Sequence, residues 1–211
     1  KRQVWLGLNT LDRERLPQLA WGIHAGAFVA SLWTALQFWT DMSFFPQGPN
    51  PASTFVNRNF FAEFLVCTLP FSAWLLVRAR NSANVALLAF SLGFNLVAMF
   101  MTGTRSALIA LGALAVVTPV LLWRYREQLA ARHWTSGTRI LAAGVLLGSV
   151  LGLGLVSTGN PKLIEENRVE GRGLTALERG FARAKSMAQT EEYTQRSFSV
   201  RWVMWKATAR I

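Results

Sequence analysis

The sequence predicts an all-α integral membrane protein, a polytopic bundle of transmembrane helices. Three observations predict this class. Of the 211 residues, 52% are hydrophobic and only 16% are charged. The hydrophobic residues gather in stretches close to the roughly 20 residues that cross the hydrocarbon core of a bilayer. These stretches are apolar on nearly all faces, which is typical of helices surrounded by lipid rather than of amphipathic surface helices.

Five spans can be drawn in chain order, at approximately 17–38, 60–77, 84–102, 106–123 and 140–156, which makes residues 1–157 a transmembrane bundle. Neither 84–102 nor 106–123 contains a charged residue, so Arg105 falls where one span ends and the next begins. Residues 158–211 are too polar to span and are expected to begin a large loop outside the bilayer. Because the chain starts at Lys1 and a helical pattern continues to Ile211, we expect it to be a piece of a longer protein.

Basic residues indicate the orientation of these spans, because short cytoplasmic loops are enriched in Lys and Arg. The net charge of +11 is distributed over alternate loops, which argues against nucleic acid as a partner. We therefore expect the enriched loops to face the cytoplasm and loops 40–59 and 103–105 to face outward. The enriched loops carry Lys1, Arg2, Arg13, Arg15, Arg78, Arg80, Arg124, Arg126, Arg132 and Arg139.

Arg58 and Arg105 are the two basic residues in the short outward loops, and each lies at the start of a span. A shared anionic ligand would explain both, because arginine binds phosphate oxygens bidentately and stays charged. The alternative is two unrelated anchors that reach lipid head groups. Asp41 is the single acid in these loops, and metal-dependent diphosphate sites need carboxylates. We therefore expect neither a metal nor a cofactor.

The polar segment after residue 157 contains two expected helices. Gly159, Asn160 and Pro161 should end the fifth span. Apolar residues at three- and four-residue spacing then predict an amphipathic helix on the membrane surface or over the bundle; they are Leu174, Leu177, Phe181 and Ala184. A second helix from about residue 196 would bring Arg201 towards the membrane as a third outward arginine.

Small residues in the fifth span form a separate pattern. Gly144, Gly148 and Gly152 recur every four residues. Such spacing lets helix backbones approach closely. We interpret it as packing within the bundle, with dimerisation as the less favoured use.

Three motifs resemble the O-antigen ligase and O-antigen polymerase superfamily, in the order and on the side expected for it. The segment FVNRNFFAEFL (55–65) resembles the asparagine-bearing loop that opens a span. The segment TGTRSALIAL (102–111) resembles the signature (S/T)-R-(G/S)-A. The segment RWVMWKA (201–207) resembles the R-x-x-x-W element of the large periplasmic loop.

The resemblance implies a bacterial inner-membrane glycosyltransferase of the polytopic C type (GT-C-like), with its active site facing the periplasm. Its implied donor is a glycan linked to undecaprenyl diphosphate, and it uses no metal. By motif, Arg105 and Arg201 would bind the diphosphate, and we add Arg58 from the topology. The implied general base is a periplasmic histidine that should lie beyond Ile211, so the catalytic base is unknown; His24 and His133 are not substitutes.

Within this superfamily we favour an O-antigen ligase, which transfers O-antigen polysaccharide to the lipid A core during lipopolysaccharide biosynthesis. The basic loop containing Arg172, Arg179, Arg183 and Lys185 would suit a phosphorylated core. The rivals are an O-antigen polymerase and a protein O-oligosaccharyltransferase, which differ in acceptor. From another class, a transporter of lipid-linked glycans would use the same arginines without chemistry, and a purely structural subunit would leave Arg58 and Arg105 unexplained.

Overall fold

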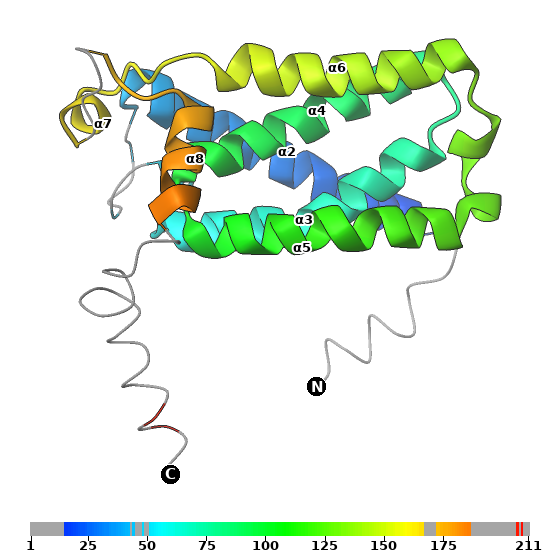
Figure 1. The fold of residues 1–211 in the computed structure, drawn as a ribbon, viewed down its shortest axis with the longest axis horizontal. Helices are drawn as coiled ribbons and strands as arrows, with labels where there is room; N and C mark the ends of the chain where they lie inside the picture. The colour runs from blue at the N-terminus through cyan, green and yellow to red at the C-terminus, as the bar shows by residue number, and fades with distance from the viewer. Residues whose placement is uncertain are drawn as a thin grey trace.

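The computed structural model describes residues 15–42, 44, 48, 51–166, 172–186, 206 and 208. Within these residues, five helices are long and apolar enough to cross a membrane (Figure 1). They are α2 (Leu16–Thr40), α3 (Arg58–Arg78), α4 (Ser82–Thr102), α5 (Arg105–Arg124) and α6 (Ser136–Gly154). The expectation of a helical, multi-pass membrane protein is confirmed at this level.

Polar caps explain why three of these helices begin earlier than the apolar stretches suggest. The side chains of Asn57, Asn81 and Thr135 accept hydrogen bonds from backbone N–H groups in the first turns of α3, α4 and α6. Such caps satisfy amides that have no partner within the helix. Each helix therefore starts two to four residues before the predicted span, in a polar turn that hydropathy leaves out.

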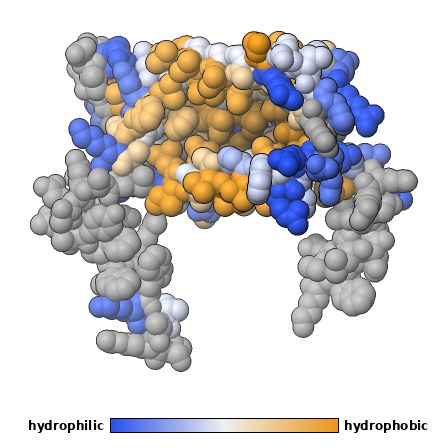
Figure 2. Space-filling model, turned by 45° about the vertical axis from the view of Figure 1, so that its right-hand side comes forward, coloured by the Kyte–Doolittle hydropathy of each residue, from blue (hydrophilic) through white to orange (hydrophobic). Residues whose placement is uncertain are grey.

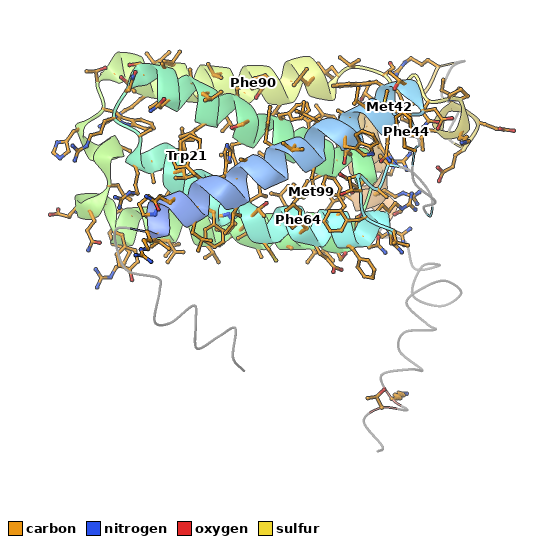
Figure 3. All side chains as sticks on the ribbon, turned by 180° about the vertical axis from the view of Figure 1, so that it is seen from behind. Trp21, Met42, Phe44, Phe64, Phe90 and Met99 are labelled. Carbon is orange, nitrogen blue, oxygen red and sulfur yellow. The ribbon has the colours of Figure 1, made fainter. Side chains whose placement is uncertain are left out.

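The bundle is organised around α4. In the apolar 18-residue stretch of α4, 72% of the residues are buried, compared with 6% in that of α5 and 17% in that of α6. Helices α2, α3 and α6 pack against α4, while α5 packs against α3. Met99 of α4 lies in the core, and Phe64 of α3 packs against that core (Figure 3). Figure 2 shows the resulting apolar surface over the middle of the bundle, with hydrophilic residues towards its ends.

The glycine pattern of α6 does not pack as predicted. A Cβ built on Gly144, Gly148 or Gly152 would meet nothing within 4 Å, so this face of α6 is open in the described structure. The close approach of α6 to α4 occurs on another face. There, a Cβ on Gly93 would lie 1.9 Å from Ser149 Oγ and 3.0 Å from the Leu146 carbonyl oxygen.

Two ends of the bundle can be distinguished. At the Arg78 end, α3 and α5 finish and α4 and α6 begin, and the short 3₁₀ helices η1 (Arg126–Gln128) and η2 (Ala130–His133) connect α5 to α6. At the Arg105 end, α2 and α4 finish and α3 and α5 begin. The two predicted arginines of the short outward loops, Arg58 and Arg105, both lie at this second end.

The chain after α6 folds back onto the Arg105 end. It forms the short helix α7 (Pro161–Glu166) and then α8 (Ala176–Ser186), which lies across the end of the bundle (Figure 1). Asn160 fastens this segment to α2, since its Nδ2 donates to the Gln37 carbonyl at 2.8 Å and to Asp41 Oδ1 at 2.9 Å. Leu163 and Ala176 join a core cluster with residues of α2 and α4.

Helix α8 lies over the bundle, which is one of the two placements predicted. Of its predicted apolar face, Leu174, Leu177 and Ala184 are half-buried, but the prediction is wrong for Phe181. Phe181 is 67% exposed, whereas Ala176, Arg179 and Gly180 are buried. The reason is close packing, because a Cβ on Gly180 would lie 2.4 Å from the Phe100 ring of α4. Only small residues, and an arginine that passes beside them, fit on this side. The helix predicted from about residue 196 lies largely outside the described residues.

Candidate anion-binding site

The loops at the Arg105 end bring Arg58 and Arg105 to the starts of neighbouring helices. The residues beside them are linked, since Thr104 Oγ1 donates to Asn59 Oδ1 at 3.4 Å. Arg105 Nε donates to Ser186 Oγ of α8 at 3.2 Å. Both side chains are half-buried. Arg201, the third predicted site residue, lies outside the described residues.

Gly103 makes the turn that separates α4 from Arg105. Its φ is +61°, a left-handed conformation that glycine adopts without steric cost, and its N–H donates to the Phe100 carbonyl. The missing side chain also makes room for α8, because a Cβ here would lie 3.0 Å from Arg179 Nε. The turn that positions Arg105 therefore also packs against the side chain of Arg179.

Arg179 is the most deeply buried charged side chain among the described residues at this end. Its side chain is 3% exposed, and its Nε and Nη2 have no hydrogen-bond partner among the described residues. Nη1 of Arg58 is buried in the same unpartnered state. Buried donors are normally hydrogen-bonded, and an unpaired charged donor is costly. Three strong donors at this end thus have no acceptor in the part of the chain that the structure describes.

Glu166 of α7 is the carboxylate that balances part of this charge. Its Oε2 lies 3.8 Å from Arg179 Nη2 and its Oε1 lies 3.5 Å from Arg183 Nη2. Burial lowers the pKa of Arg179 to about 10; Glu166 opposes this shift, and the nearby charges of Arg58 and Arg183 add to it. We call Arg58, Arg105, Arg179 and Arg183 the arginine cluster. With Glu166 it carries a formal charge of +3, from four arginines and one carboxylate.

Two of the basic residues expected to attract a phosphorylated acceptor do not present free charge. Arg172 is paired with Glu178, through Nη1 to Oε2 at 2.8 Å, and Arg179 is buried. The Glu178 carboxylate also accepts from the Thr175 N–H at 2.8 Å. The Arg172 hydrogen bond, followed by the Thr175 one, lowers the pKa of Glu178 to about 2. The acceptor hypothesis itself stays a prediction, in which Arg172 is paired and Arg179 is buried.

The two histidines of the described residues lie away from the arginine cluster. His24 is 4% exposed inside the bundle, where Nδ1 lies 2.8 Å from Ser72 Oγ and Nε2 lies 2.9 Å from Ser91 Oγ. It thus links α2 to α3 and α4. His133 is exposed in η2 at the Arg78 end. Among the described residues, no three side chains of the metal-ligating types gather at one place.

Comparison with protein-family models, with curated proteins and with solved structures gave no match to this chain. The site must therefore be interpreted from its own chemistry. Guanidinium groups bind carboxylates and phosphates with paired N–H donors. A cluster with surplus positive charge and unpartnered buried donors can bind an anion that carries several oxygens, such as a phosphate or a diphosphate.

Arg179 and Arg183 were not assigned to this site from the sequence. Their spacing of four residues, which puts two side chains on the same helix face, was the available signal. The apolar spacing of Leu177 and Phe181 instead favours a different buried face. The close packing of Gly180 on Phe100 brings the Arg179 side of α8 onto the bundle.

Proposed function

We propose that this protein is a membrane glycosyltransferase of the O-antigen ligase type, which transfers a glycan from undecaprenyl diphosphate to the lipid A core. The observation that carries the proposal is the arginine cluster, where buried guanidinium N–H groups of Arg58 and Arg179 have no hydrogen-bond partner among the described residues. A diphosphate supplies the oxygens and negative charge that such a site lacks.

The orientation is part of the same proposal. Of the described basic residues, Arg15, Arg78, Arg80, Arg124 and Arg139 lie at or next to the Arg78 end. By the positive-inside rule this end faces the cytoplasm, and the Arg105 end faces the periplasm from the inner membrane. The bundle is then the arginine-bearing part of a GT-C-like enzyme, with residues 158–211 in a periplasmic loop.

The reaction follows from a diphosphate bound at the arginine cluster. The acceptor hydroxyl oxygen attacks the anomeric carbon, the bond from that carbon to the diphosphate oxygen breaks, and the diphosphate leaves with the bonding electrons. The hydroxyl proton goes to a general base, which the resemblance implies is a histidine of the periplasmic loop. The leaving diphosphate gains negative charge, and fixed cationic donors stabilise such charge most where it develops.

The test compares two arginines at opposite ends of one helix. Arg105→Ala replaces the arginine that begins α5. Arg124→Ala, the matched control, replaces the arginine that ends it. Full-length protein in liposomes receives lipid-linked glycan and lipid A core, with and without a metal chelator. We expect Arg105→Ala to slow transfer on the order of 100-fold, Arg124→Ala to stay near the wild-type rate, and the chelator to have no effect.

Other outcomes would redirect the proposal. Normal transfer by Arg105→Ala would make that residue a lipid anchor. Wild-type transfer to a second lipid-linked glycan, or to a protein hydroxyl, would indicate a polymerase or a protein O-oligosaccharyltransferase. Movement of the lipid-linked glycan across the bilayer without transfer would indicate a transporter.

A further inference from the structure

Glu166 occupies an unusual place within the arginine cluster. It faces Arg179 and Arg183 at 3.8 and 3.5 Å, yet neither contact is a hydrogen bond, since N–H donors lie about 2.7–3.2 Å from their acceptors. Its side chain is 43% exposed, in contrast to 3% for Arg179. The carboxylate therefore balances charge from the rim and leaves the buried donors unmet.

The ligand that these donors fit has more oxygens and more charge than a carboxylate. Nε and Nη2 of Arg179 and Nη1 of Arg58 are buried and unpartnered among the described residues. A single carboxylate has two oxygens and one negative charge, whereas a diphosphate has several terminal oxygens and at least two charges. A diphosphate thus has enough oxygens for donors on Arg58, Arg179 and Arg183, whose charges act on one another, and Glu166 then becomes a competing anion.

We propose that Arg58, Arg179 and Arg183 form a diphosphate-binding site in which Glu166 is a resident counter-ion that the incoming diphosphate displaces. The proposal deepens the proposed function and rests on it, because it assigns the same lipid-linked diphosphate as ligand. It adds two binding residues from α8 and a role for α7 that tunes affinity. An exposed carboxylate held only by charge can turn away without disturbing the core.

The backbone around Glu166 supports displacement of a side chain rather than unfolding of α7. Asn160 Oδ1 accepts from the Lys162 N–H at 3.0 Å, and Leu163 is 4% exposed against the bundle. The first turn of α7 is therefore held in place, while Glu166 is the last residue of the helix. Rotation of this one exposed side chain would remove its charge from Arg179 and Arg183 without unfolding α7.

The first experiment measures binding of undecaprenyl diphosphate, without a glycan, to the full-length protein in nanodiscs. Glu166→Gln removes the competing charge and keeps the side-chain shape. Glu165→Gln, the neighbouring exposed carboxylate, is the matched control. We expect roughly fivefold tighter binding for Glu166→Gln, the upper range for an exposed ion pair, and no change for Glu165→Gln. Equal or weaker binding by Glu166→Gln would overturn the proposal.

The second experiment separates binding from a structural role for Arg179. Arg179→Gln should weaken binding about tenfold or more, as expected when a charged donor is lost. If Arg179 served only to hold Glu166, the double variant with Glu166→Gln would bind like Glu166→Gln alone. If Arg179 contacts the diphosphate, the double variant will bind about tenfold more weakly than Glu166→Gln alone. Equal affinity of the double variant and Glu166→Gln would therefore refute direct binding.

Two further arms identify the ligand and keep the two proposals distinguishable. Phosphatidylglycerol tests whether any lipid phosphate suffices; the same gain of affinity with this singly charged phosphodiester would overturn the diphosphate assignment. Binding needs no transfer, so a Glu166 effect on binding combined with normal transfer by Arg105→Ala would leave this inference standing while the glycosyltransferase mechanism failed. Arg105-dependent transfer without a Glu166 effect would show the reverse.

Discussion

Arg179 provides a test in which stability and binding should change in opposite directions. Its side chain is 3% exposed, and burial lowers its pKa to about 10, well below that of an exposed arginine. The lower pKa means that the folded protein disfavours the charged form. At about 1.4 kcal/mol for each pKa unit, holding this charge in place costs about 3 kcal/mol of folding free energy.

Replacing Arg179 by methionine removes that cost and retains a long, unbranched side chain that can fill the space. We expect Arg179→Met to raise the free energy of unfolding by about 1–3 kcal/mol, the lower values reflecting imperfect filling. The same variant should lose affinity for undecaprenyl diphosphate. A gain of stability at the expense of binding is expected where a binding site contains buried polar groups without hydrogen-bond partners.

Reversible unfolding in mixed micelles, followed with increasing SDS at pH 7.5, measures the change. A buried base with a lowered pKa reduces the free energy of unfolding by its full amount below that pKa. This loss of stability becomes smaller as the pH rises above the pKa. The difference between Arg179→Met and wild type should therefore be constant up to about pH 9 and shrink above pH 10. Arg124→Met, at the exposed end of α5, is the control. A loss of stability of 1 kcal/mol or more for Arg179→Met would refute the reasoning.

Two further predictions concern packing and titration. Gly93→Ala should destabilise the bundle by about 1–3 kcal/mol, because its Cβ would meet Ser149 Oγ at 1.9 Å. In the same SDS assay, the control Gly144→Ala faces open space and should be neutral or slightly stabilising. Equal effects of the two substitutions on the free energy of unfolding would contradict this prediction. Glu178, hydrogen-bonded by Arg172, should titrate near pH 2 when its carboxyl group is followed by carbon NMR. The stability that its ionised form contributes is therefore present above about pH 4.5 and is lost towards pH 2. A titration midpoint at about pH 4 would argue against this pairing.

Much of the fold could be predicted from the sequence, since burial in lipid imposes a simple requirement. A span must be long, apolar and helical, because its backbone groups cannot hydrogen-bond to lipid. Hydropathy therefore located the five spans, and alternation of loops put Arg58 and Arg105 at one end. The starting residues of α3, α4 and α6 differed, because capping by Asn57, Asn81 and Thr135 is a local hydrogen-bond effect that hydropathy does not contain.

The tertiary structure alone decided how that end is completed. The sequence marks Arg179 as one polar residue of an amphipathic helix and Phe181 as an apolar one, and burial reverses the two. The reason is steric and long-range: a side chain larger than that of Gly180 would clash with Phe100, and Gly103 leaves room for the Arg179 guanidinium. The sequence by itself thus determined which helices exist and which arginines share an end, whereas side-chain packing between α4 and α8 determined which of them are buried together around Glu166.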